Sequence, residues 1–150
     1  MTVTFEVRGR VAIITLNRPE ARNAVSQQLA EDLEAAIDRL ESDADLWIGI
    51  LCGNGPSFCA GADLKSYTID YATRPATEFR ERYTDGAGFG GITRGLEIDQ
   101  PIVAAINGFT IPRGLALAEA RDIRFRSPTA DSAPPDVHSR LHPRAGASSH

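Results

Sequence analysis

The sequence predicts an α/β domain in which strands alternate with helices. Three compact runs of apolar and β-branched residues are typical of buried strands: Val11–Leu16, residues 47–52 and Ile102–Ile106. The segments between these runs are long enough for helices, and the first of them carries apolar residues at helical spacing. Strands separated by helix-length segments favour an α/β domain whose crossover connections are right-handed.

Two strands and a tight connection are expected at the N-terminus. Residues 3–7 alternate polar and apolar side chains, as a strand with one buried face does. The Arg-Gly-Arg sequence at residues 8–10 suits a hairpin turn into the run Val11–Leu16. The Asn-Arg-Pro sequence at residues 17–19 then ends the second strand.

The clearest local signal is a helix that begins after Ser26. A serine hydroxyl at this position accepts a hydrogen bond from an amide of the first helical turn. Glu31 and Asp32 follow near the positive end of the helix dipole. The apolar residues of the segment fall on one face, which we expect to be buried: Leu29, Leu33, Ala36, Ile37 and Leu40.

Two regions do not fit the alternating pattern. Residues 75–99 begin like a helix, but four glycines lie between residues 86 and 91. Each glycine would cost a continuous helix about 1 kcal/mol relative to alanine. Residues 127–150 contain four prolines and only two large apolar residues. We therefore predict a core over residues 1–126 and a poorly ordered tail over residues 127–150.

The composition argues against several classes of function. An apolar content of 42% is ordinary for a soluble globular domain. The net charge of −4 and the scattered arginines give no basic surface for nucleic acid. No run of apolar residues is long enough for a membrane span, and the N-terminus lacks the apolar segment of a signal peptide. We expect a cytoplasmic protein with neither nucleic-acid nor membrane partners.

The cysteines and histidines do not predict a metal site. Cys52 and Cys59 lie in or beside apolar runs, where a reduced, buried thiol is the expected state. His138, His142 and His150 are irregularly spaced in the proline-rich tail, where solvated histidines are expected.

The segment most suited to chemistry is residues 57–65, which follow a strand and a glycine-rich turn. Gly61 permits an unusual backbone dihedral or a close approach of the backbone to a ligand. The amides of Ala62 and Asp63 would then be free donors at a helix N-terminus, where negative charge is stabilised. A tight turn between strand and helix, with no ligand, remains the alternative.

Two stretches of the chain resemble the crotonase superfamily, which contains the enoyl-CoA hydratases and isomerases. The first runs from the LNRPEARNA sequence through the helix and buried strand to FCAGADL. The second is QPIVAAINGFTIPRGLALAEARDIRF. Together they cover most of residues 11–126 in the family's order and spacing. The resemblance implies a spiral of β-β-α units that binds a coenzyme A thioester.

The resemblance also implies roles for individual residues. In the family, two backbone amides bind the thioester oxygen as it becomes an enolate, and they match Ala62 and Arg113. Arg22 is a candidate to pair with a phosphate of coenzyme A, although an exposed arginine that is unpaired or paired with Glu20 is an equal alternative. Coenzyme A enters as part of the substrate, and no separate cofactor is expected. The coenzyme A moiety would lie against two segments that include Arg22, Ala24, Ala60, Asp63 and Leu64.

The chain departs from the family at the carboxylates. Hydration across a double bond needs both a base and an acid, normally two glutamates. One of these positions is Ala116 here, and the other is Asp136 in a weaker match. Glu119 is about 300° further around the helix than Ala116, so we expect a surface residue and not a substitute. Asp136 is either a base with a raised pKa in a dry pocket or an exposed residue of a mobile tail.

A second departure affects the oxyanion site, since Pro112 and Arg113 replace part of the family's glycine-rich run. Full-length members also continue with a C-terminal helical region that builds trimers, often paired into hexamers, so we expect this chain to be truncated before that region. The expected function is action on 2- or 3-enoyl-CoA thioesters through enolate stabilisation, in a homo-oligomer if the protein is intact. A single carboxylate supplies isomerisation more easily than hydration. The alternatives are an inactive CoA-binding paralogue and a non-functional fragment.

Overall fold

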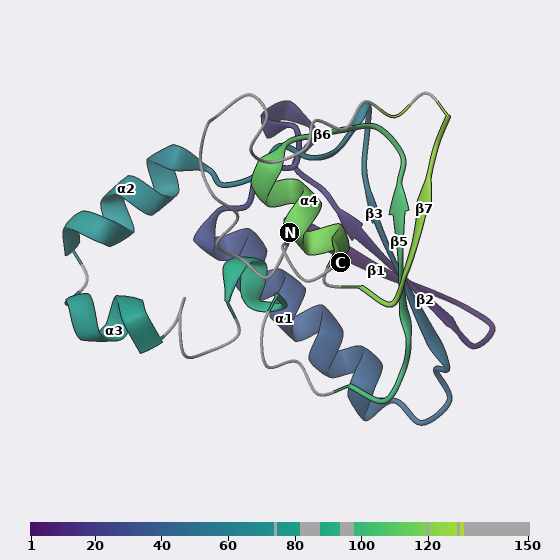
Figure 1. The fold of residues 1–150 in the computed structure, drawn as a ribbon. Coiled ribbons are helices and arrows are strands. Elements are labelled where there is room, and N and C mark those ends of the chain that lie inside the picture. Colours follow the sequence, from purple (N-terminus) through teal and green to yellow (C-terminus); the bar gives the residue numbers. More distant parts are fainter. Residues whose placement is uncertain (74, 82–87, 94–97, 120, 129, 131–150) are drawn as a thin grey trace.

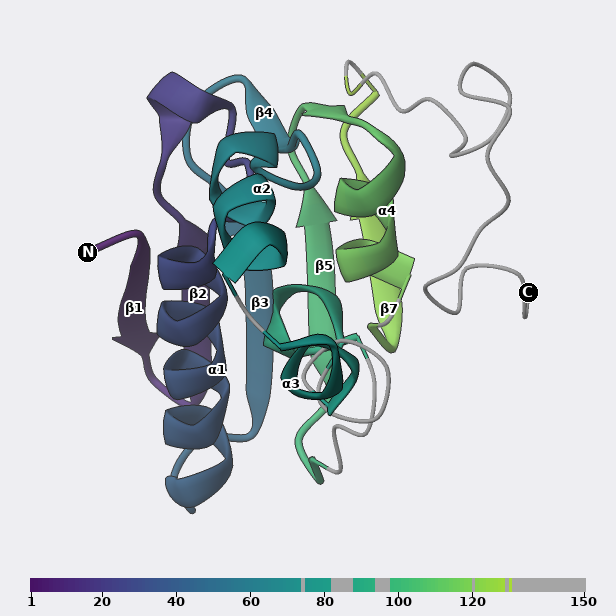
Figure 2. The same cartoon turned by 90° about the vertical axis from the view of Figure 1, so that its left-hand side faces the viewer.

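The computed structural model describes residues 1–73, 75–81, 88–93, 98–119, 121–128 and 130. Its centre is a five-stranded sheet in the order β1-β2-β3-β5-β7, which can be followed across the sheet in Figure 2. β1 and β2 form an antiparallel hairpin, and the remaining neighbours are parallel. The α/β prediction is therefore confirmed. The strands are Val3–Arg8 (β1), Val11–Leu16 (β2), Ile48–Gly53 (β3), Ile102–Ile106 (β5) and Ile123–Arg126 (β7).

A second, two-stranded sheet consists of β4 (Ser57–Cys59) and β6 (Phe109–Thr110) in parallel. Each of these short strands follows a strand of the large sheet by a few residues, so β3-β4 and β5-β6 are equivalent turns of the chain. The two pairs lie side by side, because β3 pairs with β5 as β4 pairs with β6. This repeated turn has the form expected of a spiral of β-β-α units.

The helices gather on one face of the large sheet (Figure 2). α1 (Gln27–Ser42) and α4 (Pro112–Glu119) pack there, while α2 (Leu64–Thr73) and α3 (Ala76–Arg80) project to one side (Figure 1). Two short 3-10 helices, η1 (Pro19–Ala21) and η3 (Phe89–Gly91), lie in the connections. None of the described helices is both long and apolar enough to cross a membrane.

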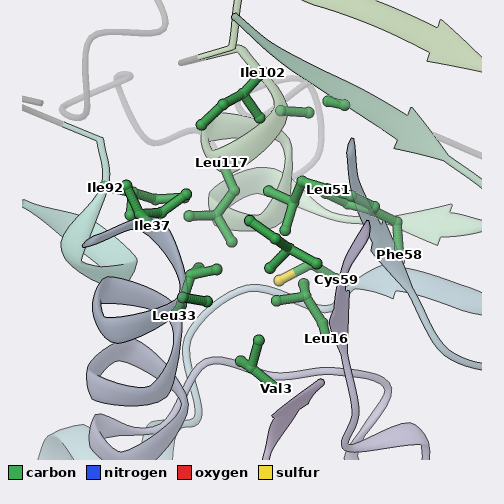
Figure 3. Packing of buried hydrophobic residues seen from close by; sticks show 14 of the residues in the cluster. Val3, Leu16, Leu33, Ile37, Leu51, Phe58, Cys59, Ile92, Ile102 and Leu117 are labelled. Atoms are coloured by element: carbon green, nitrogen blue, oxygen red, sulfur yellow. The ribbon is translucent and has the colours of Figure 1, made fainter. Parts of the chain in front are cut away.

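α1 confirms the helix predicted from the sequence. The Ser26 hydroxyl accepts a hydrogen bond from the Leu29 amide at 3.2 Å, and the five predicted face residues are all buried, together with Ala30. Leu33 and Ile37 meet Leu117 of α4 and side chains from the strands in a single core (Figure 3).

Several boundaries differ from the prediction. Trp47, predicted to begin a buried strand, precedes β3 and is 61% exposed, with the Arg10 guanidinium 4.3 Å from the ring centroid. The helix expected near the start of residues 75–99 is the five-residue α3, and the glycines at 88, 90 and 91 adopt positive φ. Most of the predicted tail, residues 131–150, lies outside the described residues.

Candidate active site

Two loops meet at Val25 and Ala62, which form an isolated parallel bridge. The Val25 amide donates to the Gly61 carbonyl at 2.7 Å, and the Asp63 amide donates to the Val25 carbonyl at 2.9 Å. Earlier in both segments, the Ala60 amide donates to the Arg22 carbonyl at 2.9 Å. These bonds fix the turn after β4 against the loop between η1 and α1.

The bridge determines where the Ala62 amide points. Gly61 has φ of +81°, a conformation that glycine adopts without a steric penalty. In a planar trans peptide the C=O of one residue and the N–H of the next point in opposite directions. Because the Gly61 carbonyl is directed at Val25, the Ala62 N–H is directed away from it. No described residue accepts a hydrogen bond from the Ala62 amide.

The expectation of two free amides is wrong for Asp63. Its N–H is bonded to the Val25 carbonyl, because a parallel bridge uses the groups that flank the bridged residue. α2 begins one residue later at Leu64, and the Tyr67 amide donates to the Asp63 carbonyl at 3.0 Å. Of the two amides predicted to be free donors, that of Ala62 is therefore the one left for a ligand.

Asn23 is a buried anchor that the sequence analysis missed. Its side chain accepts a hydrogen bond from the Arg18 amide at 2.9 Å and donates to the carbonyls of Asn54 and Ser57 at 2.9 and 2.8 Å. Its φ of +56° is one that asparagine tolerates better than most residues. The asparagine thus joins the loop that contains Arg22 and Ala24 to the start of β4.

A partly buried ion pair between Arg18 and Asp63 was also missed. Arg18 Nη1 lies 3.0 Å from Asp63 Oδ2 and donates to the Ala24 carbonyl at 2.7 Å. Burial raises the pKa of the Asp63 carboxyl, but hydrogen bonds from Arg18, Ser66 and Lys65 and the Arg18 charge together bring this pKa below its ordinary value. Asp63 is therefore an anion at neutral pH.

The N-terminus of α4 lies beside the same turn. The Ile111 amide donates to the Cys59 carbonyl at 3.3 Å, and the Gly114 amide donates to the Ile111 carbonyl at 2.7 Å. Arg113 is the second residue of α4, so its backbone belongs to this first turn. Burial raises the pKa of the Cys59 thiol to about 12, so the thiol is neutral and not a nucleophile.

The residues predicted to line coenzyme A lie on two segments that the fold brings together, but some of them have interaction partners that were not expected. Arg22 is exposed, and Glu20, its suggested partner, lies instead 4.0 Å from Arg18. The Ala24 carbonyl is occupied by Arg18, as described above. Leu64 is 76% exposed at the start of α2.

Comparison with known proteins identifies the fold and the family. A family model described as enoyl-CoA hydratase/isomerase matches residues 6–149. The chain belongs to the enoyl-CoA hydratase/isomerase family. The crystal structure of a probable enoyl-CoA hydratase/isomerase from Mycobacterium abscessus superposes with a TM-score of 0.78 at 36% identity. That alignment covers 97% of this chain and 53% of the other, and it confirms the crotonase-like fold class.

Curated relatives are similar at the sequence level. The enoyl-CoA hydratase EchA19 of Mycobacterium tuberculosis is 33% identical over 141 residues, which are 94% of this chain and 52% of the relative. The (E)-benzylidenesuccinyl-CoA hydratase of Thauera aromatica is 38% identical over 131 residues, or 87% of this chain and 48% of the relative. The chain thus spans about half the length of the curated relatives it matches.

Of the two positions that carry the family's glutamates, the structure describes Ala116 but not Asp136. Ala116 is 4% exposed in the core and carries no ionisable group. Glu119 was expected at the surface, which is wrong in part, because the residue is half-buried and its Oε2 atom is inside the structure. The last turn of α4 is enclosed on most sides, with Leu117 and Ala118 also buried. Asp136 and the three histidines lie outside the described residues.

Proposed function

We propose that this chain binds an acyl-CoA thioester and stabilises the enolate that forms when the α-carbon loses a proton. The observation that supports this most directly is the hydrogen bond from Val25 to the Gly61 carbonyl, which directs the Ala62 N–H away from the bridge. A preorganised donor aimed at a developing oxyanion typically lowers a reaction barrier by about 3–4 kcal/mol. The substrates proposed are 2- or 3-enoyl-CoA thioesters.

The second oxyanion donor in this proposal is the Arg113 amide, in the first turn of α4. The first N–H groups of a helix have no partner within the helix and carry a partial positive charge. Arg22, which is exposed on the loop that borders the turn, would contact a phosphate of coenzyme A. A homo-oligomer of the trimeric or hexameric kind is proposed for the whole protein.

The fate of the proton distinguishes isomerisation from hydration. Hydration needs a base for water and an acid for the α-carbon, whereas a single base can move a proton between two carbons. Ala116 supplies neither group, so we propose isomerisation with Asp136 as the single base. Asp136→Asn should then abolish turnover, and an undiminished rate in that variant would rule out this role.

A protein that binds coenzyme A thioesters without turnover is the second candidate. It is favoured by the alanine at position 116, because that position of α4 carries no carboxylate. The Ala62 turn would still bind the thioester oxygen in such a protein. Binding and turnover must therefore be measured separately.

Thermal unfolding of the purified chain with and without acetoacetyl-CoA tests the proposal. A ligand at a hundredfold excess over its dissociation constant stabilises the folded state by about 2.7 kcal/mol. Free coenzyme A, which lacks the thioester oxygen, is the matched control and should raise Tm less. A cooperative transition that does not move at saturating acetoacetyl-CoA would contradict thioester binding. Crotonyl-CoA and a 3-enoyl-CoA then test hydration and isomerisation.

A further inference from the structure

We propose that Arg18 and Asp63 form a positioning pair that keeps the Ala62 amide in the orientation needed to donate to a thioester oxygen. This inference rests on the proposed function, in which that amide is an oxyanion donor. Neither side chain would touch the substrate in this role. Both would act through the backbone of the turn.

The orientation of the Ala62 amide is set only indirectly, by hydrogen bonds of the neighbouring backbone groups. The Val25–Gly61 hydrogen bond of 2.7 Å sets one peptide plane, and the Val25–Asp63 hydrogen bond of 2.9 Å sets the next. Gly61, with φ of +81°, is the most permissive residue in this stretch, so its dihedrals do not hold the plane. An oxyanion donor must keep its geometry within about 0.5 Å and 10–20° to be effective.

Arg18 connects the two residues that flank the bridge. A single nitrogen, Nη1, donates to the Ala24 carbonyl, next to Val25, and to the Asp63 carboxylate, next to Ala62. The guanidinium therefore spans the gap between the two loops beside the bridge itself. Both side chains are about one-fifth exposed, so water screens their attraction less than that of a surface pair.

Arg18 and Asp63 each make further hydrogen bonds, with groups outside the pair. The Arg18 amide donates to the buried Asn23 side chain, and the Arg18 carbonyl accepts from the Asn23 amide at 2.8 Å. On the other side, the second oxygen of Asp63, Oδ1, accepts from the Ser66 amide at 3.4 Å in the first turn of α2. The pair thus joins this hydrogen-bonded loop to the start of α2, and Ala62 precedes Asp63 in the turn between them.

Nuclear magnetic resonance of the chain without ligand tests the positioning directly. Asp63→Asn keeps the shape and an oxygen for Ser66 but removes the charge, and Arg18→Gln removes the double contact. We expect the order parameter of the Ala62 N–H to fall from about 0.85 to below 0.6 in both variants. Asp32→Asn is the control, because this carboxylate is also hydrogen-bonded and partly buried but contacts Thr2 and Gln28.

The order parameters of α1 amides show whether each variant is folded. If only one of the two variants folds, that variant alone is sufficient for the test. An unchanged Ala62 order parameter in a folded variant would overturn the proposal. If the ion pair were purely structural, its removal would lower Tm without a selective fall in the order parameter of the Ala62 N–H.

A second measurement separates this proposal from the proposed function. The carbon-13 shift of the labelled thioester carbonyl in bound acetoacetyl-CoA reports how strongly that carbonyl is polarised. At saturating acetoacetyl-CoA, we expect a downfield shift with the wild-type chain and loss of most of that shift in Asp63→Asn and in Arg18→Gln. No shift with the wild-type chain would refute the proposed function, whereas equal shifts in the wild type and both variants would refute the positioning role alone.

Discussion

Gly114 of α4 lies directly against the backbone of Cys59 at the end of β4. A Cβ atom at position 114 would be 2.2 Å from the Cys59 carbonyl oxygen, which is much closer than real Cβ contacts. The same carbonyl accepts the hydrogen bond from Ile111. The absence of a side chain at 114 therefore sets how closely the N-terminus of α4 approaches the Ala62 turn.

Gly114→Ala should accordingly destabilise the protein and displace the start of α4. The clash is with backbone, which cannot rotate away, and overpacking of this kind typically costs 1–3 kcal/mol, so we expect about 2 kcal/mol. Urea denaturation measures the loss, with Ala35→Ser on the exposed side of α1 as a control for a small change. A Gly114→Ala chain as stable as wild type would mean that α4 is held less closely to β4 than the structure shows.

Replacement of Ala62 by proline removes the N–H that the proposed function requires. The two hydrogen bonds of the Val25 bridge use the Gly61 carbonyl and the Asp63 amide, so they do not involve the missing group. We expect Ala62→Pro to abolish the stabilisation by acetoacetyl-CoA, measured as the shift in Tm. Ala62→Ser keeps the N–H and should retain most of the shift. Equal shifts in the two variants would show that the thioester oxygen is bound elsewhere.

Four strands, β1, β2, β3 and β5, and the helix α1 were predictable from the sequence because their signals are local, whereas β4, β6 and β7 were not predicted in this way. The apolar spacing of Leu29, Leu33 and Leu40 is complete within α1 itself, and so is the Ser26 cap. The interactions that build the site are not local. Arg18 and Asp63 are 45 residues apart in sequence, and nothing in either segment identifies the partner.

The same reason explains the error about the Asp63 amide. A turn that leads into a helix leaves several amides free when it is considered alone. The bridge to Val25 occupies one of them, and that bridge depends on how the two loops pack together. The occupied and free amides could be distinguished only once the fold was known.

Acid should weaken the attachment of the N-terminus to α1. The hydrogen bond from the Thr2 amide, with smaller contributions from the Thr2 hydroxyl and Gln28, lowers the pKa of Asp32 against the opposing effect of burial. Because the folded pKa is below the unfolded one, the unfolded chain takes up the proton first as the pH falls. The contribution of Asp32 to the free energy of unfolding is therefore complete above the pKa of Asp32 in the unfolded chain, and it is lost as the pH falls through the pKa of Asp32 in the folded chain.

Stability measured in urea from neutral to acidic pH should therefore fall less steeply in Asp32→Asn than in wild type. Glu41→Gln is a suitable control, because Glu41 is an exposed carboxylate in the last turn of the same helix. Parallel pH profiles for wild type and Asp32→Asn would contradict the assignment of this titration to Asp32.

Asn23→Ala should be among the most destabilising single changes in the chain. It leaves the Arg18 amide and the carbonyls of Asn54 and Ser57 without their side-chain partner. A buried polar group that loses its partner costs about 1–3 kcal/mol, so we expect a total loss of several kcal/mol. Alanine also tolerates the φ of +56° at this position less well than asparagine.

Urea denaturation measures this loss, and the variant Asn23→Asp, studied in the same way, separates the effect of hydrogen bonding from that of side-chain shape. The aspartate keeps an oxygen for the Arg18 amide but directs a second oxygen, in place of the amide nitrogen, at the two carbonyls. Repulsion between these acceptors should make the aspartate variant at least as unstable as the alanine variant near neutral pH. Protonation of the aspartate restores one donor, so its deficit relative to wild type should narrow in acid. A stable Asn23→Asp chain at neutral pH would show that the amide nitrogen is not what joins this loop to β4.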